Sequence, residues 1–358
     1  MSTATSVAPP ARAATFALDP GRPFVSRTFD YAVIGGGLSL LVVAALKLGA
    51  EAALTPLLLA NLGVVILLSN SAHFAASTVR LYTKRDTFRD LPFLTMGLPL
   101  VTVLVLGLAV AWPEAAGLHL RNLYLTWSPY HYSAQAYGLA VMYGYRSGGG
   151  WSVADKRLLR LACVCPFFYA FLGNRDVGLE WFVPAAVLDV PAVHAVRVGL
   201  VVVLGVASFV LPAGLFLRHQ TGGRPRLPLI SLMVVMSNGV WLVTLPYMDA
   251  FVWATIFHGL QYLAIVSIFH VRERMALPGN TRPWWRHAGG FYLACLGLGY
   301  LLFQVWPHAF VLAGFGFVES AMLVTAAINV HHFIVDAYIW RLRRDPNYAV
   351  VRPAAALG

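Results

Sequence analysis

Long apolar runs alternate with short polar segments along most of this chain. The run from Leu98 to Trp112 reads LPLVTVLVLGLAVAW, and the run from Val198 to Leu217 is apolar apart from one serine and one proline. A helix that crosses the hydrocarbon core of a bilayer needs about 20 such residues at a rise of about 1.5 Å each. The pattern therefore predicts an all-α fold, a polytopic integral membrane helical bundle.

The boundaries of the apolar runs predict about ten transmembrane helices. Their ranges are 29–48, 53–79, 92–113, 122–145, 158–174, 190–217, 227–247, 250–271, 289–306 and 309–340. The connecting segments are short, which indicates one transmembrane domain over residues 29–345. We expect residues 1–28 to form a flexible cytoplasmic tail and residues 346–358 to form a second cytoplasmic tail.

Composition and charge agree with this interpretation. Only 11% of the residues are charged and 59% are hydrophobic, whereas a soluble domain has about 25% charged residues. With the N-terminus placed inside, only four of the 26 basic residues fall on the outer side: Lys47, Arg121, Arg175 and Arg197. Because cytoplasmic loops carry an excess of Lys and Arg, we predict that both termini are cytoplasmic in a multi-pass protein of the cell (inner) membrane.

The net charge of +11 then has a topological origin. It requires no nucleic acid as a partner, and the basic loops are expected to contact the anionic head groups of the lipid bilayer. The three cysteines, Cys163, Cys165 and Cys295, fall within predicted spans. A disulfide framework is therefore not expected.

Histidine is the most informative residue type within the predicted spans. His73, His131, His258 and His332 lie on four different spans, in the cytoplasmic half of the membrane or near its middle. Ionisable side chains are costly there and indicate function. Their predicted depths differ by about 12 Å along a straight helix, so a single ring and two separate layers are both open.

Neutral imidazole is the commonest side-chain ligand for transition metals. We therefore predict that His73, His131, His258 and His332 bind a metal; the alternative is that each histidine only bonds a neighbouring helix. The motif Asn-x-x-His-Phe occurs twice, at 70–74 and at 329–333. Six further residues are predicted to orient these ligands or to replace one of them: Gln135, Gln261, Asp336, His331, Asn70 and Asn329.

Aromatic side chains near the histidines suggest an apolar substrate. The predicted substrate cavity is lined by Trp127, Tyr130, Tyr137, Trp241 and Tyr262; packing and interfacial roles are the alternative. Glu319 is expected deep in the last span, where it either bonds a hydroxyl or amide of a neighbouring helix or belongs to a proton path.

The nitrogen and oxygen donors favour non-haem iron as the cofactor, with another transition metal as an alternative. The HxxxH and HxxHH boxes of membrane desaturases do not occur in the sequence. We predict a membrane-embedded metal-dependent oxidoreductase of the non-haem iron oxygenase or oxidase type, acting on a lipid or isoprenoid, an apolar small-molecule substrate. The sequence leaves the catalytic residues and a redox partner open.

Two other functions use the same residues. A haem b held between His131 and His258 would make the chain an electron-transfer protein, because haem needs axial imidazoles on opposite faces. A transporter would use the polar groups as a path near the middle of the membrane.

Overall fold

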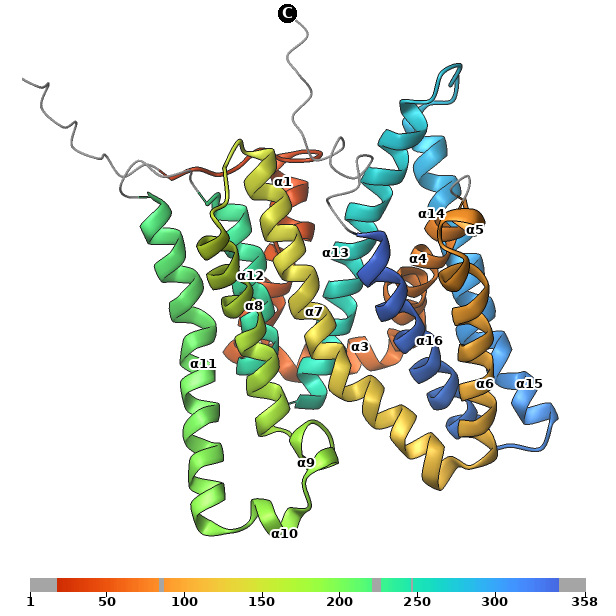
Figure 1. Cartoon of the computed structure of the whole chain (residues 1–358). Coiled ribbons are helices and arrows are strands. Elements are labelled where there is room, and N and C mark those ends of the chain that lie inside the picture. Colours follow the sequence, from red (N-terminus) through yellow and green to blue (C-terminus); the bar gives the residue numbers. More distant parts are fainter. Residues whose placement is uncertain (1–17, 84–86, 221–226, 246, 341–358) are drawn as a thin grey trace, which may run out of the picture.

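A computed structural model describes residues 18–83, 87–220, 227–245 and 247–340. The described residues form helices and no strand, as the sequence predicts. Most of the predicted N-terminal tail and all of the predicted C-terminal tail lie outside the described residues. The longer elements, shown in Figure 1, are α2 (Gly37–Ala45), α3 (Glu51–Ile66), α4 (Ala72–Thr83), α6 (Leu98–Ala111), α7 (Leu118–Arg146), α8 (Val153–Gly173), α11 (Pro191–Gln220), α12 (Leu229–Thr244), α13 (Tyr247–Met275), α14 (Trp284–Tyr300) and α16 (Phe317–Ile339).

Short helices and π-helical turns connect or extend these elements. The short helices are α1 (Arg27–Phe29), α5 (Thr87–Asp90), α9 (Leu179–Phe182), α10 (Ala185–Leu188) and α15 (Trp306–Leu312). The π-helical turns are η1 (Asp30–Ile34), η2 (Leu46–Ala50), η3 (Leu67–Ser71), η4 (Phe93–Gly97), η5 (Pro113–Gly117) and η6 (Leu301–Val305).

Six helical stretches in the described part of the chain are long and apolar enough to cross a membrane, which indicates a multi-pass membrane protein. They are Gly37–Thr83, Phe93–Ala111, Pro191–Gln220, Asp249–Met275, Trp284–Leu312 and Phe317–Ile339. The predicted spans 122–145 and 158–174 correspond to α7 and α8, whose polar residues keep them out of this set. The apolar helix α12 is shorter than the others.

The first long stretch is bent at two glycines. Gly36 has φ 80° and Gly49 has φ 95°, a backbone conformation that other residues rarely adopt. Gly36 also lies against α12, because an added Cβ would come within 2.5 Å of the Ser237 hydroxyl. The chain therefore descends through α2, turns through η2 into α3, and returns through η3 into α4.

The last two predicted spans have a different boundary in the structure. Pro307 does not separate them, because it lies in the first turn of α15, where its missing N–H is tolerated, directly after the π-helical turn η6. The turn occurs beyond Leu312, with Gly314 at φ 96°. Glu319 consequently lies in the first turn of α16, half-buried, where the helix dipole favours an acidic group. The expectation that Glu319 lies deep in a span is wrong.

The helices pack as two groups that share a centre. One group contains α8, α11 and α12, and the other contains α4, α6, α14 and α16 (Figure 1). Helix α7 crosses obliquely between the groups, and α13 packs on both α12 and α14. The centre of the molecule is therefore formed by α7 and α13.

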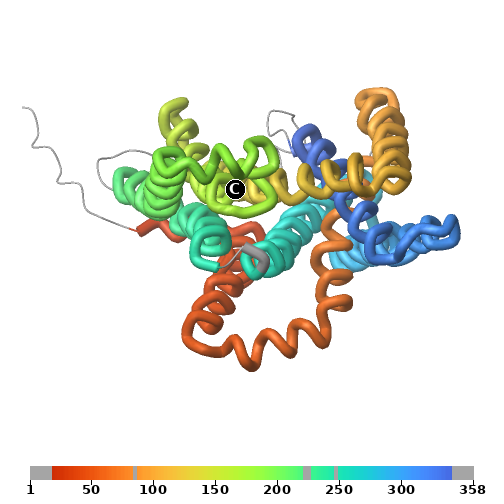
Figure 2. The backbone as a smooth tube through the Cα atoms, turned by 90° about the horizontal axis from the view of Figure 1, so that it is seen from below, coloured from red at the N-terminus to blue at the C-terminus, as the bar shows by residue number. Residues whose placement is uncertain are grey.

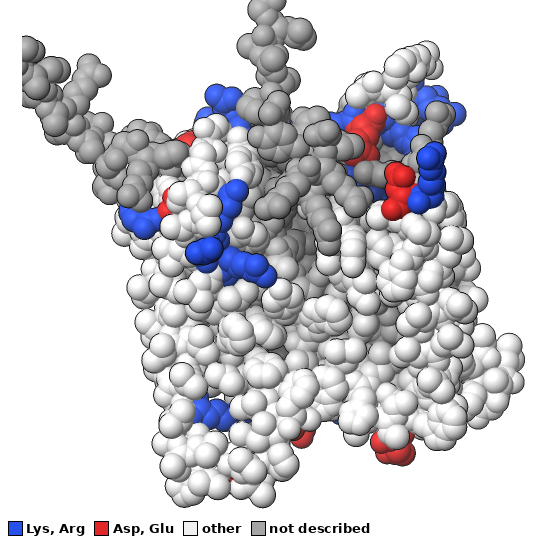
Figure 3. Space-filling view, viewed as in Figure 1, with Lys and Arg blue, Asp and Glu red and all other residues white. Residues whose placement is uncertain are grey.

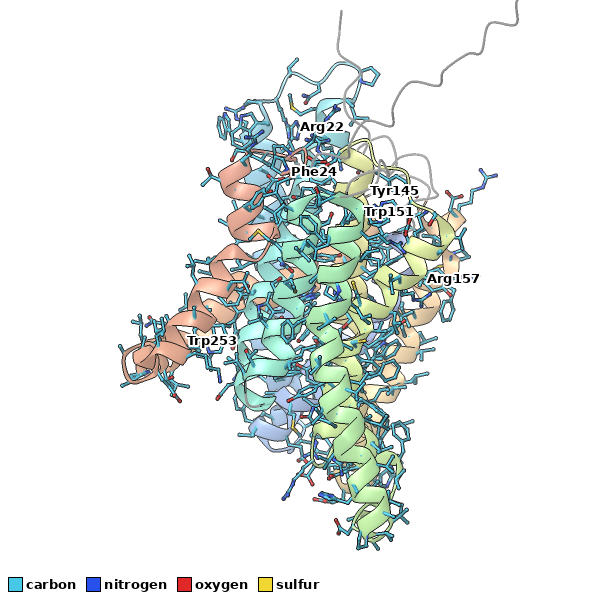
Figure 4. The ribbon with its side chains drawn as sticks, turned by 90° about the vertical axis from the view of Figure 1, so that its left-hand side faces the viewer. Arg22, Phe24, Tyr145, Trp151, Arg157 and Trp253 are labelled. Carbon is cyan, nitrogen blue, oxygen red and sulfur yellow. The ribbon has the colours of Figure 1, made fainter. Side chains whose placement is uncertain are left out.

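Basic side chains gather at one end of the bundle, the upper end in Figure 3. The segment before α1 closes this end, and Figure 4 shows Arg22 and Phe24 there. The guanidinium groups of Arg146 and Arg272 lie 4.5 and 5.3 Å from the centre of the Phe24 ring. The buried Asp30 carboxylate accepts hydrogen bonds from the Phe24 amide, at 2.5 Å, and the Tyr143 hydroxyl, at 2.7 Å. These contacts attach the N-terminal segment to α7 and α13.

Candidate metal centre

Four helices bring one histidine each to the centre of the bundle. His73 comes from α4, His131 from α7, His258 from α13 and His332 from α16. Their side chains are 0%, 8%, 1% and 1% exposed. The residues predicted from the sequence as metal ligands therefore form one cluster, although their helices are separated by long stretches of chain.

The four imidazole rings are in mutual contact. The His73 ring centre lies 4.8 Å from that of His258 and 4.4 Å from that of His332. The His131 ring centre lies 4.9 Å from that of His258, 5.0 Å from that of His332 and 6.4 Å from that of His73. Each ring centre lies within 5.0 Å of two others, so the four rings form one cluster and not two separate sites.

The π-helical turn η3 places His73 in this cluster. Two glycines allow its backbone to approach neighbouring helices: an added Cβ at Gly259 of α13 would lie 3.1 Å from the Ser69 carbonyl oxygen. At Gly299 of α14, the Cβ would lie 2.8 Å from the Ser71 carbonyl. Single π-helical turns inside α-helices are frequent at functional sites. Here the turn is held between two helices immediately before a candidate ligand.

One carboxylate joins the imidazoles. The Nε2 atoms of His332 and His131 are 3.3 Å apart. The Oδ2 atom of Asp336, one turn beyond His332, lies 3.3 Å from His332 Nε2 and 3.9 Å from His131 Nε2. Nitrogen and oxygen donors therefore converge on one point from α7 and α16.

Two sets of donor atoms have the spacing of a metal site. One contains His73, His131 and His258, and the other contains His131, His332 and Asp336; within each set, one ligand atom per residue lies within 4.8 Å of the others. His131 belongs to both. Among the described residues, both ring nitrogens of His73 and the Nε2 atom of His258 have no hydrogen-bond partner. Since an unpaired buried polar group is costly, these nitrogens are suited to bind a ligand.

Ser77, which the sequence analysis did not select, orients the His332 ring. Its hydroxyl donates to the Phe74 carbonyl at 3.1 Å and lies 2.9 Å from His332 Nδ1. The contact with Ser77 fixes the orientation of the ring. The Nε2 atom of His332 then faces His131 and Asp336. Ser77 follows His73 by four residues on the same helical face, a spacing that would have indicated it.

Tyr262 and Trp340 hold the Asp336 carboxylate in a similar way. The indole N–H of Trp340 donates to the Tyr262 hydroxyl at 3.3 Å, and this hydroxyl donates to Asp336 Oδ1 at 2.7 Å. The Tyr262 ring centre lies 4.5 Å from that of His73. Tyr262, expected from the sequence to line a cavity, therefore fixes a candidate ligand. Trp340, at the end of α16, was not selected because no sequence pattern connects it to the histidines.

The other residues expected to orient or replace the ligands lie around the cluster. The Gln135 amide donates to the His258 carbonyl at 3.3 Å and to Gln261 at 3.4 Å, and Gln261 donates to the Ile34 carbonyl at 2.9 Å. Both glutamines therefore bond backbone or each other, and neither bonds an imidazole in this conformation.

The remaining three of these residues differ in their surroundings. The His331 Nδ1 atom lies 2.9 Å from the Thr102 hydroxyl of α6, so this ring belongs to a different helix interface from His332. Asn329 donates to the Thr325 carbonyl of its own helix at 2.7 Å. The Asn70 side-chain oxygen is buried and, within the described residues, has no hydrogen-bond partner.

The predicted cavity-lining aromatics are spread over several interfaces. Trp127 packs on Phe333, whose ring stacks on His131 with centres 4.5 Å apart. Tyr130 packs on Phe167 of α8, and Tyr137 packs on the core of α7 and α8. Trp241 donates to the Ser39 hydroxyl at 2.9 Å. The two phenylalanines of the repeated motif, Phe74 and Phe333, both contact the imidazole cluster.

No protein-family model, curated protein or solved structure matches this chain. A function for the chain is therefore argued from the chemistry of the cluster.

Proposed function

We propose that this protein is a membrane-embedded, metal-dependent oxidoreductase of the non-haem iron oxygenase or oxidase type. The metal is held by His73, His131, His258 and His332, with the Asp336 carboxylate as a fifth donor. The substrate is a lipid or isoprenoid taken from the surrounding membrane.

The observation that carries this proposal is the set of unpaired nitrogens at His73 and His258. A buried polar atom that loses its hydrogen bond costs about 1–3 kcal/mol, and three such atoms occur in two adjacent rings. Histidines with only a packing role would normally donate and accept hydrogen bonds across the helix interfaces. A cation bound among these rings would give the unpaired nitrogens of His73 and His258 a partner.

The donor chemistry supports iron. Imidazole nitrogen with carboxylate oxygen suits iron and other first-row metals, whereas no thiolate lies in either set of candidate ligands. When bound, such a metal would supply redox chemistry with O₂ or polarise the substrate. The protein contributes a dry site, because every candidate ligand is less than a tenth exposed. Ser77 and Tyr262 orient the ligands His332 and Asp336.

Ring packing favours this assignment over haem b. The rings of His131 and His258 have centres only 4.9 Å apart and are inclined by 73°. Axial imidazoles must lie on opposite faces of the macrocycle. Two imidazole rings as close as those of His131 and His258 leave no space for a haem between them. A transporter that uses these polar residues is the remaining alternative.

We further propose that α6, α7, α8, α11, α12, α13, α14 and α16 cross the cell (inner) membrane, whereas the shorter helices α2 and α4 enter and leave it at the same end. An even number places both termini on one side. The gathering of basic residues at the end of the bundle where α1 begins supports a cytoplasmic position for that side.

The proposal is tested by elemental analysis and an absorption spectrum of protein purified in mild detergent without a metal-binding tag. We expect stoichiometric iron and no Soret band, and turnover of a lipid or isoprenoid with O₂ in a substrate screen. A Soret band would favour the haem alternative. Protein that contains no metal and takes up none in reconstitution would favour a transporter.

Two variants of α13 make this test specific to the site. His258→Ala removes a candidate ligand, so we expect loss of the metal with normal membrane insertion. His270→Ala removes a histidine of the same helix that stacks on Phe291, with ring centres 4.5 Å apart, outside the cluster; it should retain the metal. Full metal content in His258→Ala would remove this residue from the site.

A further inference from the structure

Helix α3 stands apart from the bundle. None of its residues is buried, and it packs mainly on η2 and η3, its own neighbours in the chain. Leu57 and Leu59 are each 63% exposed. Figure 2 shows the chain leaving the bundle at α2 and returning at η3, so that residues 37–66 form an arm, here named the α3 arm.

Helix α3, with the sequence EAALTPLLLANLGVVI, is apolar apart from Glu51 in its first turn, Thr55 and Asn61, and the Asn61 amide donates to the Leu57 carbonyl of the same helix at 2.9 Å. A helix that lies at the membrane surface has one polar and one apolar face, which α3 lacks. A helix that is apolar all round belongs in a protein core or in hydrocarbon. No residue of α3 is buried in protein, and Figure 1 shows α3 midway between the two ends of the bundle, so hydrocarbon is the environment that suits its leucines.

Aromatic side chains connect the arm with the metal centre. Trp253 of α13 lies on the side of the bundle from which the arm projects (Figure 4). Its ring is 5.9 Å from Phe257, and the Phe257 ring is 6.4 Å from Trp241. The next residue along α13 is His258, whose ring is 4.5 Å from Tyr132. Trp253, Phe257, Trp241 and Tyr132 belong to one apolar cluster with Val43 of α2.

We propose that the apolar tail of a bilayer lipid lies along Trp253 and Phe257 toward His258, on the side of α13 from which the α3 arm projects. This inference rests on the proposed function and deepens it. It makes the substrate a membrane-dissolved molecule with a long apolar chain, which enters sideways from the bilayer beneath the arm. Because the arm contacts the bundle only at its two ends, a chain can enter without separation of packed helices.

The test uses the full chain in nanodiscs that contain a trace of a phospholipid with a photoactivatable diazirine in its acyl chain. After irradiation, the labelled peptides are mapped by mass spectrometry. We expect label on α3 and around Trp253 to exceed several-fold the label on the lipid-facing side of α11, where Val202 and Val203 are 60% and 63% exposed. The excess should persist after exchange into detergent, which removes loosely bound lipid.

A matched pair of tryptophan variants tests whether Trp253 contributes to lipid binding. Trp253→Ala should reduce the lipid that remains per protein after detergent exchange several-fold. Trp285→Ala, which removes a tryptophan that is 55% exposed on α14, should leave the amount of retained lipid unchanged. Equal labelling of α3 and α11, or cross-links between the α3 helices of two copies, would overturn the inference.

The same mapping in His258→Ala separates this inference from the proposed function. Loss of metal with the lipid label still on α3 and α13 supports both. A wild-type protein that binds no metal but carries this label would refute the metal function alone. Bound iron without excess label would refute the lipid site alone.

Discussion

At the residue scale, the molecule distinguishes histidines that the sequence alone treats as equivalent. His331 and His332 are adjacent, but they lie about 100° apart around α16. The first ring lies against Thr102 of α6, and the second lies against Ser77 and His131. The partner of each ring follows from the direction in which its side chain leaves the helix.

This adjacent pair provides a direct prediction for metal binding. We expect His332→Ala to lose the bound metal, because it removes a candidate donor whose ring Ser77 orients. His331→Ala should retain the metal, since it alters only the contact with Thr102. Metal content per protein measures both, and loss of metal from His331→Ala alone would contradict the arrangement.

A second prediction concerns the orientation of Asp336. Tyr262→Phe removes the hydroxyl that donates to Asp336 Oδ1 but keeps the aromatic ring. Loss of a partner that orients a ligand typically lowers metal affinity about 10–100-fold, and we expect a loss of this order with a changed metal absorption spectrum. Tyr82→Phe, which loses a bond to the Thr95 carbonyl of η4, should match wild type. An unchanged spectrum and affinity in Tyr262→Phe would assign this residue a packing role.

At the element scale, the placement of His73 depends on how closely η3 approaches its neighbours. The turn fits between α13 and α14 only because Gly259 and Gly299 have no side chains at the points of contact. A larger residue would displace η3 and, with it, the candidate ligand two residues beyond Ser71. The cluster is therefore built by backbone packing as well as by its own side chains.

Substitution of one of these glycines should reveal this dependence. Gly299→Ala places a Cβ 2.8 Å from the Ser71 carbonyl, and overpacking of this kind costs about 1–3 kcal/mol. We expect a lower thermal unfolding temperature and weaker metal binding. Gly297→Ala, on the same helix with open space around the added Cβ, should be as stable as wild type. Equal behaviour of the two variants would show that η3 can move without affecting the site.

At the scale of the whole molecule, the cluster lies where the two helix groups meet. The group of α4, α6, α14 and α16 contributes His73, His332 and Asp336, and the helices between the two groups, α7 and α13, contribute His131 and His258. The basic end is closed by the N-terminal segment through Phe24 and Asp30. The arrangement places the candidate metal centre in the interior of the helical bundle and most basic residues at one end of it.

The orientation of the whole molecule can be measured with single added cysteines. The three native cysteines are buried, so a membrane-impermeant thiol reagent should not reach them. Thr281→Cys lies exposed in the segment that joins α13 to α14, and Ala186→Cys lies exposed in α10. In intact cells with the outer membrane removed, we expect labelling at position 186 and protection at position 281. The reverse pattern would invert the proposed topology.

The sequence by itself determined the class of this protein and its candidate ligands. Apolar runs such as Leu98–Trp112 have one stable outcome in a bilayer, because the backbone must satisfy its hydrogen bonds within each helix. Histidines are costly in such runs, so their presence alone identified the four ligand candidates. Helix boundaries were harder to predict where local and tertiary effects compete. Pro307 suggests the end of a helix, but in the structure it lies in the first turn of α15, directly after a π-helical turn.

Only the tertiary structure decided how these residues meet. Depth along each helix is nearly fixed by sequence, but rotation and tilt depend on packing, so one ring of imidazoles could not be distinguished from two layers. The spacing from His73 indicates that Ser77 shares its helical face, but its contact with His332 of α16 and the contact of Trp340 with Tyr262 of α13 depend on how the helices pack. The α3 arm likewise emerged only in three dimensions, because an apolar helix that crosses a bundle and one that stands apart from it have the same sequence pattern.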